Sequence, residues 1–114
     1  MEQEHIIAAL AALAQENRLD TYRLLVQAGP EGLPAGEIAA KLGIPPNTLS
    51  FHFDRLRHAG LVSVERHGRS LIYAARYDTM NALINYLTEN CCGGRPELCK
   101  PAIRGLAKRK KEAV

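Results

Sequence analysis

The chain has 114 residues, of which 46% are apolar and 24% are charged. This length suits a single domain with a modest core, and the apolar content excludes a disordered body. No apolar run approaches the roughly 20 residues that span a bilayer, and the N-terminus is acidic where a secretory signal would be basic. We therefore expect no membrane segment and predict a cytoplasmic protein.

The net charge of +3 is unevenly distributed along the chain. Residues 100–114 carry a net charge of +5, whereas residues 1–99 carry −2. Overall basicity is thus a property of the tail and is weak evidence for a nucleic-acid partner. A second basic region is more informative, because residues 46–76 hold five arginines against two acidic side chains.

Apolar periodicity predicts two helices at the start of the chain. The first covers residues 3–15, and its apolar face consists of Ile6, Leu10, Leu13 and Ala14, widened by Ile7. Such a wide stripe on a terminal helix favours a partner helix from a second subunit. The second covers residues 18–28, is capped by Asn17 and ends at Gly29. Its predicted inward residues are Leu19, Tyr22, Leu25 and Val26.

Two short helices separated by a tight turn come next. Pro34 suits the first turn of a helix that ends at Gly43. A further helix runs from about residue 46 to 59 and stops at Gly60. Two short helices around a tight glycine-containing turn are typical of the helix-turn-helix arrangement.

The hydrophobic period then changes from 3.6 to 2. Residues 61–66 and 70–75 are predicted to be strands around a turn at Gly68, followed by a last helix over about residues 78–90. The apolar stripe of that helix is Met80, Leu83, Ile84 and Leu87. The predicted fold class is mainly α with a β-hairpin wing, which is a winged helix-turn-helix.

The helix at 46–59 is a candidate DNA-binding surface. Leu49, Phe53 and Leu56 follow the i, i+4, i+7 pattern and should face the core, and His52 beside them is predicted to be a packed, hydrogen-bonded histidine. The opposite face presents Asn47, Thr48, Ser50, Phe51, Asp54 and Arg55. Small polar side chains can bond bases or phosphates in the major groove, Asn can read adenine, and Phe51 can meet a thymine methyl group.

Arginines extend this candidate surface. Arg55 and Arg57 could hold phosphates and set the register on DNA, and Arg66 and Arg69 in the hairpin could contact the backbone or the minor groove. For the helix alone, a merely solvated polar face explains the pattern equally well. The order of helix, turn, helix and basic hairpin favours DNA binding.

All three cysteines lie between residues 91 and 99, at Cys91, Cys92 and Cys99. A four-thiolate zinc site would need an outside ligand, whereas three thiolates suit trivalent arsenic or antimony. Gly93 and Gly94 would let the chain fold back so that Cys99 approaches the pair. A redox-responsive cluster, in which Cys91 or Cys92 forms a disulfide with Cys99, and incidental surface cysteines both remain open.

The residues argue against an enzyme. Cysteine-based phosphatase loops need an arginine six positions after the cysteine, and those positions hold Glu97, Leu98 and Gly105. No Ser-His-Asp constellation or phosphate-binding glycine loop is present. We expect no catalytic function.

The pattern Leu49-Ser50-x-His52-Phe53, followed by Ala59-Gly60-Leu61-Val62 and Gly68-Arg69 in the wing, resembles the ArsR/SmtB family of winged-helix repressors. The resemblance covers about residues 5–92. It implies a homodimer built from the first and last helices that binds an inverted-repeat operator in double-stranded DNA. Two recognition helices would then enter major grooves about 34 Å apart.

The resemblance also narrows the sensing site. Some arsenic sensors of the family carry a Cys-x-Cys-x-x-Cys group at the start of the recognition helix, where residues 47–52 hold no cysteine. Zinc sensors use Asp and His along the last helix, and Asp78 has no helical histidine partner. Cys91, Cys92 and Cys99 resemble the C-terminal three-cysteine site of the arsenite and antimonite sensors.

These expectations combine into one functional hypothesis. Residues 1–92 would form the winged helix-turn-helix domain for DNA binding and dimerisation, and residues 93–114 the metalloid-binding loop and basic tail. The protein would be a transcriptional repressor that leaves its operator when the inducer, trivalent arsenic or antimony, binds the three thiolates. The alternative is a thiol redox-responsive winged-helix regulator.

Overall fold

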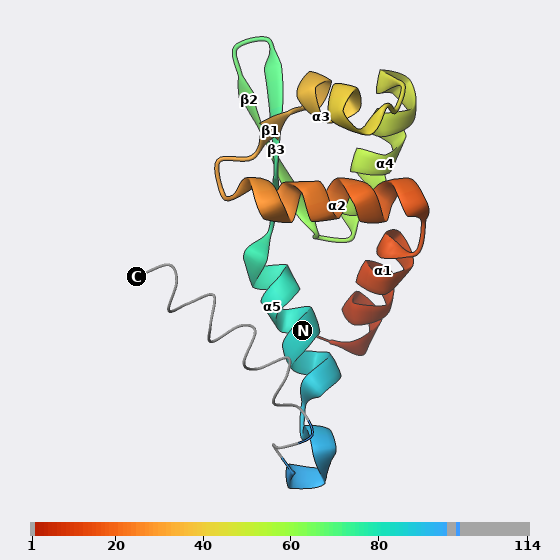
Figure 1. Ribbon diagram of the computed structural model, residues 1–114, viewed down its shortest axis with the longest axis vertical. Helices are drawn as coiled ribbons and strands as arrows, with labels where there is room; N and C mark the ends of the chain where they lie inside the picture. Colours follow the sequence, from red (N-terminus) through yellow and green to blue (C-terminus); the bar gives the residue numbers. More distant parts are fainter. Residues whose placement is uncertain (1, 96–97, 99–114) are drawn as a thin grey trace. The chain divides into compact units, whose positions relative to one another are not determined.

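The computed structural model describes residues 2–95 and 98, and Figure 1 gives the order of the elements. They are α1 (Gln3–Leu13), α2 (Glu16–Ala28), β1 (Leu33–Pro34), α3 (Ala35–Leu42), α4 (Pro46–His58), β2 (Val62–His67), β3 (Ser70–Ala75), α5 (Tyr77–Thr88) and the 3-10 helix η1 (Cys91–Gly94). The chain divides within α5 into two compact units, Met1–Leu83 and Ile84–Val114. Within the part that the structure describes, no helix combines the length and apolar character needed to cross a bilayer.

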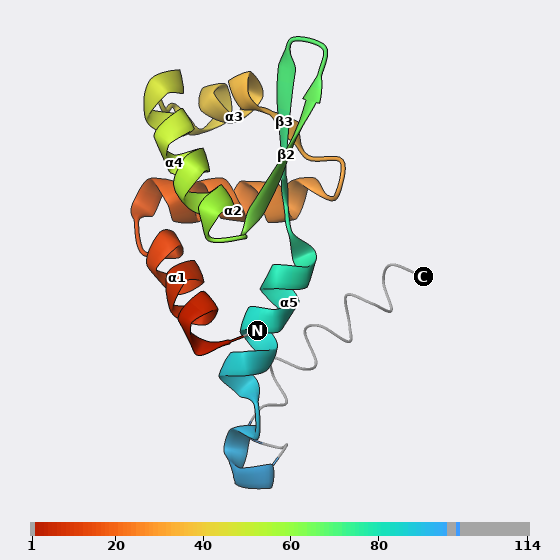
Figure 2. The same cartoon turned by 180° about the vertical axis from the view of Figure 1, so that it is seen from behind.

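The first unit contains a three-stranded antiparallel sheet of order β1-β3-β2. The β2–β3 hairpin pairs from Val62 opposite Ala75 to His67 opposite Ser70, which confirms the predicted wing. The short β1 pairs Leu33 with Tyr73 and was not predicted, because two residues are too few to display a period of two. Figures 1 and 2 show the hairpin standing beside α3, on the same side of α2 as α3 and the start of α4.

The core lies where α2, α3 and α4 meet the sheet. Leu25, Ile38, Leu49, Leu56 and Leu61 are almost completely buried there, one or more from each of the three helices. The ring of Phe53 stacks on that of Tyr73 with centroids 3.7 Å apart and planes inclined by 8°. This aromatic pair fixes α4 against β3 and so fixes the helix relative to the wing.

The face that α1 buries in the fold differs from the apolar face predicted for this helix. Ile6, Ala9 and Ala12 are buried, whereas Leu10 is 41% exposed and Ala14 follows the helix as an exposed residue. Of the predicted apolar face, Ile6 is buried and Leu13 is partly buried, because Ala9 and Ala12 complete the packed face of the helix. The partner helix from a second subunit stays a prediction. Ile7 and Leu10 are consequently left at the surface, with Ile7 at 57% exposure.

The start of α2 also lies earlier than predicted. The N-cap is Gln15, whose side-chain Oε1 accepts a hydrogen bond from the backbone N–H of Arg18 at 2.9 Å. Asn17 lies inside the first turn, where its backbone oxygen accepts from the Thr21 hydroxyl at 2.7 Å. Leu19, predicted to be buried, is 43% exposed because the helix turns its Thr21, Tyr22 and Leu25 face inward.

The second unit begins inside α5. Ile84 and Leu87 lie on its exposed surface, at 39% and 59% exposure. After α5, Asn90 takes a left-handed conformation with φ of 54°. The short helix η1 follows directly and contains Cys91 and Cys92.

Candidate nucleic-acid interface

A tight turn presents α4 to solvent at its N-terminal end. Gly43 ends α3 in the left-handed conformation, with φ of 65°, and Ile44 is buried immediately after it. The Ile44 N–H donates to the carbonyl oxygen of Ala39 at 3.1 Å, which closes the turn. Pro46 then begins α4 at a position that needs no N–H donor.

The two faces of α4 have opposite character. Leu49, His52, Phe53 and Leu56 are buried. The side chains predicted to contact DNA are all exposed: Asn47, Thr48, Ser50, Phe51, Arg55 and Arg57. The structure therefore places this whole set on the solvent side of one helix, where a DNA groove could reach it.

Neighbouring side chains hold the two arginines of α4. The Arg55 guanidinium carbon lies 5.1 Å from the centre of the Phe51 ring, a cation–π arrangement. Arg57 lies 3.7 Å from the Asp54 carboxylate. Both partners of that ion pair are about half exposed or more, so it contributes little stability. Each arginine can therefore leave its partner side chain and contact a phosphate with little loss of stability.

The hairpin tip carries the second group of predicted contacts. Arg66 and Arg69 are exposed there. Between them in sequence, His67 Nε2 lies 3.1 Å from the Glu65 carboxylate.

At the base of β3, Arg76 donates to Asp78 at 2.9 Å, and this hydrogen bond holds the pKa of the Asp78 carboxyl below its usual range. Arg76 is therefore engaged within the protein, and the wing arginines are the ones presented outward.

His52 is a packed histidine, as predicted, with 6% exposure. Its Nδ1 lies 3.5 Å from Nη1 of Arg18 in α2. Burial, and secondarily the positive charge of Arg18, lower the pKa of His52. His52 is therefore neutral near pH 7 and accepts from the guanidinium.

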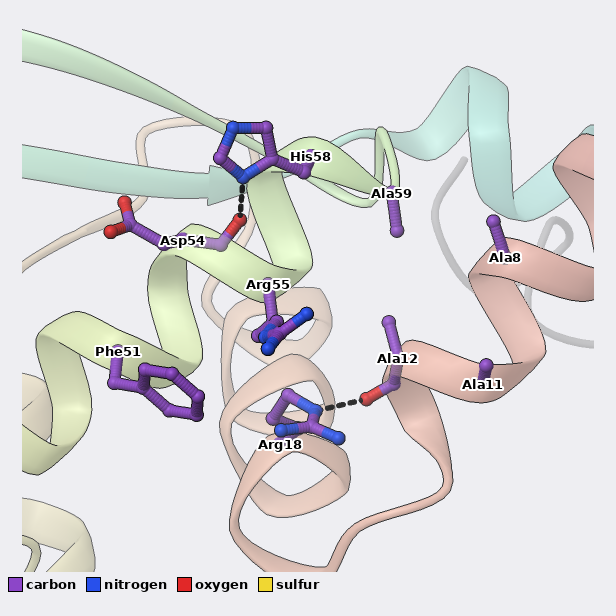
Figure 3. A pocket seen from close by; sticks show the side chains of 9 residues that line it. All are labelled: Ala8, Ala11, Ala12, Arg18, Phe51, Asp54, Arg55, His58 and Ala59. Carbon is purple, nitrogen blue, oxygen red and sulfur yellow. Dashed lines mark hydrogen bonds between the residues drawn. The ribbon is translucent and has the colours of Figure 1, made fainter.

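A pocket of about 670 Å³ lies between α1, α2 and α4 (Figure 3). It is lined by Ala8, Ala11, Ala12, Arg18, Phe51, Asp54, Arg55, His58 and Ala59. Sequence reasoning missed it, since residues from three separate helices form its walls. The alanine pairs of α1 were the available signal, because small side chains leave space beside a helix.

The structure covers only part of the predicted metalloid site. Cys91 and Cys92 are half-buried in η1, and Cys92 is disulfide-bonded. Cys99 lies outside the described residues. Among residues 2–95 and 98, no three His, Cys, Asp or Glu side chains are grouped so that they could hold a metal ion. The three-thiolate site stays a prediction.

Comparison with known proteins gives consistent matches. A family model described as a helix-turn-helix domain matches residues 13–65. The HTH-type transcriptional regulator YceK of Bacillus subtilis is 37% identical over 73 residues, which cover 64% of this chain and 72% of YceK.

Two solved structures share the fold. HlyU from Vibrio cholerae superposes with a TM-score of 0.63 at 28% identity, covering 81% of this chain and 99% of HlyU. The homodimeric winged helix-turn-helix DNA-binding domain of Mb0332 from Mycobacterium bovis, described as a possible ArsR-family regulator, gives a TM-score of 0.62 at 26% identity and covers 76% and 81% of the two chains. The chain therefore belongs to the HTH-type transcriptional regulators, with the winged-helix fold of the ArsR/SmtB type.

Proposed function

We propose that the protein is a metalloid-responsive repressor, which binds operator DNA as a homodimer and releases it when trivalent arsenic or antimony is bound by Cys91, Cys92 and Cys99. The observation that carries the DNA-binding part is the exposed polar face of α4, fixed beside a hairpin with outward arginines. Relatives that are transcriptional regulators support the same reading.

The chemistry of α4 suits the major groove. Asn47, Thr48 and Ser50 occupy its first turns and are exposed, so their short side chains can approach base edges closely. Arg55 and Arg57 lie one to two turns later, where they can reach phosphates and fix the register of the helix. The wing arginines add contacts to an adjacent stretch of backbone.

Exposed apolar side chains support a dimer. In the first unit, Ile7 and Leu10 are exposed on α1, and in the second unit Ile84 and Leu87 are exposed on α5. Exposed apolar clusters of this kind mark interaction surfaces. The Mb0332 domain, which shares the fold, is homodimeric. We therefore assign dimerisation to the first and last helices.

The inducer assignment rests on the three thiols. Soft thiolate ligands select thiophilic ions, and binding as thiolates releases protons. Closure of residues 93–98 around an ion would act on the end of α5, which is part of the proposed dimer interface. Reciprocal linkage then requires that the metalloid weakens DNA binding by the same factor by which DNA weakens metalloid binding.

A thiol redox switch is the second candidate, because Cys92 is disulfide-bonded. In this alternative an oxidant takes two electrons from two thiols, two protons leave, and the disulfide that forms changes operator affinity. A dithiol reductant reverses the step. Both candidates use the same DNA-binding surface, so only the inducer separates them.

One titration tests the proposal. The protein is bound to a duplex from its own upstream region and is titrated with arsenite, antimonite, Zn(II) or methylarsenite in a reducing buffer. In a separate arm, the complex is treated with peroxide and then with dithiothreitol. Release by arsenite and antimonite in wild type, and its loss in Cys99→Ser, is the expected result. Release by peroxide alone supports the redox switch, and an arsenite response that survives in Cys99→Ser contradicts the three-thiolate site.

A further inference from the structure

We infer that the pocket between α1, α2 and α4 binds a small aromatic carboxylate, and that this ligand opposes DNA binding by engaging Arg55. The cysteines that we propose as metalloid ligands do not line this pocket. The binding half of the inference is independent of the proposed function, whereas the effect on DNA rests on it.

Two guanidinium groups supply the positive charge. Arg18 enters from α2 and Arg55 from α4, and both line the pocket (Figure 3). Neither forms an ion pair with a carboxylate among the described residues. Two like charges around one space repel each other, so an anion between them is favoured. A carboxylate matches the forked donor geometry of a guanidinium.

The acidic residue of the pocket does not cancel this charge. Asp54 belongs to the lining, but its carboxylate is paired with Arg57 at 3.7 Å. In Figure 3 that carboxylate points away from Arg18 and Arg55. His52 contributes no charge either, since burial lowers its pKa and keeps it neutral behind Arg18.

Apolar walls distinguish an organic anion from an inorganic one. The methyl groups of Ala8, Ala11 and Ala12 form the α1 wall, and the Phe51 ring lies on the opposite side (Figure 3). A flat aromatic body can contact both the methyl groups and the ring while its carboxylate meets the arginines. The volume of about 670 Å³ lies in the range of small-molecule sites, which is about 300–1,000 Å³.

Ligand binding in this pocket would reach the DNA-binding surface directly. Arg55 is both a pocket residue and a predicted phosphate contact, so a bound carboxylate competes with DNA for it. Arg18 also donates from Nε to the carbonyl oxygen of Ala12 at 2.6 Å and contacts His52 in α4. A ligand on Arg18 therefore acts on the side chain that connects α1 to α4.

The test uses the full-length protein and sodium benzoate as the probe, followed by two-dimensional amide NMR at constant ionic strength. Benzamide and inorganic phosphate are the matched neutral and inorganic probes. We expect saturable shifts of pocket residues with benzoate and about tenfold weaker binding of benzamide, since the charge-assisted bonds are lost. Phosphate should bind more weakly than benzoate because it gains nothing from the apolar walls.

Two pairs of variants locate the site. Arg55→Gln should weaken benzoate binding about tenfold, whereas Arg23→Gln, at an exposed position of α2 outside the pocket lining, should leave it unchanged. Ala11→Phe should fill the pocket and abolish binding, whereas Ala40→Phe, on an exposed position of α3, should not. Circular dichroism checks that each variant is folded.

Several results would overturn the inference or one part of it. If the wild-type protein shows no saturable binding of benzoate, the inference is overturned. A second copy of the chain that covers the pocket would give this result as well. Equal binding of phosphate and benzoate, or equal losses of benzoate binding in Arg55→Gln and Arg23→Gln, would indicate nonspecific anion attraction and would also overturn the inference. If benzoate binds but leaves affinity for the operator unchanged, the coupling to DNA is wrong while the site stands. If no operator is bound at all, the proposed function fails and the benzoate result is unaffected.

Discussion

Nη1 of Arg18 lies 3.5 Å from Nδ1 of the buried His52, while Nε of the same guanidinium donates to the carbonyl oxygen of Ala12 at 2.6 Å. One side chain of α2 thus connects the C-terminal end of α1 with the buried face of α4. Because a guanidinium stays protonated and can only donate, His52 must accept at Nδ1 and carry its hydrogen on Nε2. The connection requires neutral His52.

We predict that protonation of His52 destabilises the fold. Burial is the main cause that lowers the pKa of His52 in the folded state, with Arg18 second. Below the ordinary histidine pKa of about 6.5, the unfolded chain therefore binds a proton that the folded chain resists, so the free energy of unfolding falls as pH drops through this range. Urea unfolding between pH 8 and about pH 5 measures this decrease in the free energy of unfolding. His52→Gln should flatten the profile relative to wild type, and the exposed His5→Gln should reproduce the wild-type profile. Identical slopes in all three proteins would contradict this role for His52.

The loop before β1 contains a glycine at which any side chain would destabilise the fold. Gly32 has φ of 72°, and a Cβ placed there would overlap the carbonyl oxygen of Tyr73 on β3. Gly32→Ala should lower the free energy of unfolding by about 2–4 kcal/mol, because it adds left-handed strain to a backbone overlap. Gly36 in α3 does not have a positive φ, and nothing lies within 4 Å of the position that a Cβ would take, so Gly36→Ala should raise stability by about 0.5–1 kcal/mol. Equal effects of the two substitutions would show that the contact between Gly32 and Tyr73 is not tight.

The elements of the fold were largely predictable from sequence. The glycine at 43, the proline at 46 and the change of period at 61 each mark a boundary that the structure reproduces within a few residues. These signals are local, since a turn conformation or a periodic face is fixed by neighbouring residues. The failures come from packing between elements: Leu19 is exposed although it was predicted to be buried, and β1 exists only because β3 pairs with it.

The candidate site divides in the same way. The exposure of Asn47, Ser50 and Arg55 follows from the period of one helix, so sequence predicts it. The Arg18–His52 contact joins residues 34 positions apart in the chain, and no local pattern signals it. The pocket shares this property, because its lining comes from three helices.

Arg69 at the wing should contribute a phosphate contact. Arg69→Gln should weaken operator binding and lower the slope of log affinity against log salt concentration by about 0.9, because one fewer counterion is released. Arg23→Gln, on an exposed position of α2, makes the same charge change away from the predicted surface and should leave the slope near the wild-type value. Fluorescence anisotropy over a salt series measures both. A parallel loss of slope in the two variants would mean that only net charge matters.

The exposed apolar residues of α1 should stabilise the dimer. Ile7 is 57% exposed, and Ile7→Glu places a charge that would have to be desolvated in a subunit interface. We expect its dimer dissociation constant to rise at least about tenfold, equivalent to about 1.4 kcal/mol. Leu71→Glu changes a similarly apolar, exposed residue of the wing and should leave dimerisation intact. Sedimentation equilibrium distinguishes them, and an unaltered Ile7→Glu dimer would exclude α1 from the interface.

We expect the exposed face of α4 and the tip of the β2–β3 hairpin to form the surface that binds DNA. The most direct test is amide NMR mapping of the isotopically labelled protein titrated with a duplex from its own upstream region. We predict that the largest changes fall at residues 47–51, 55 and 66–69. Changes concentrated on α2 or α3, with residues 47–51, 55 and 66–69 unperturbed at saturation, would contradict this prediction.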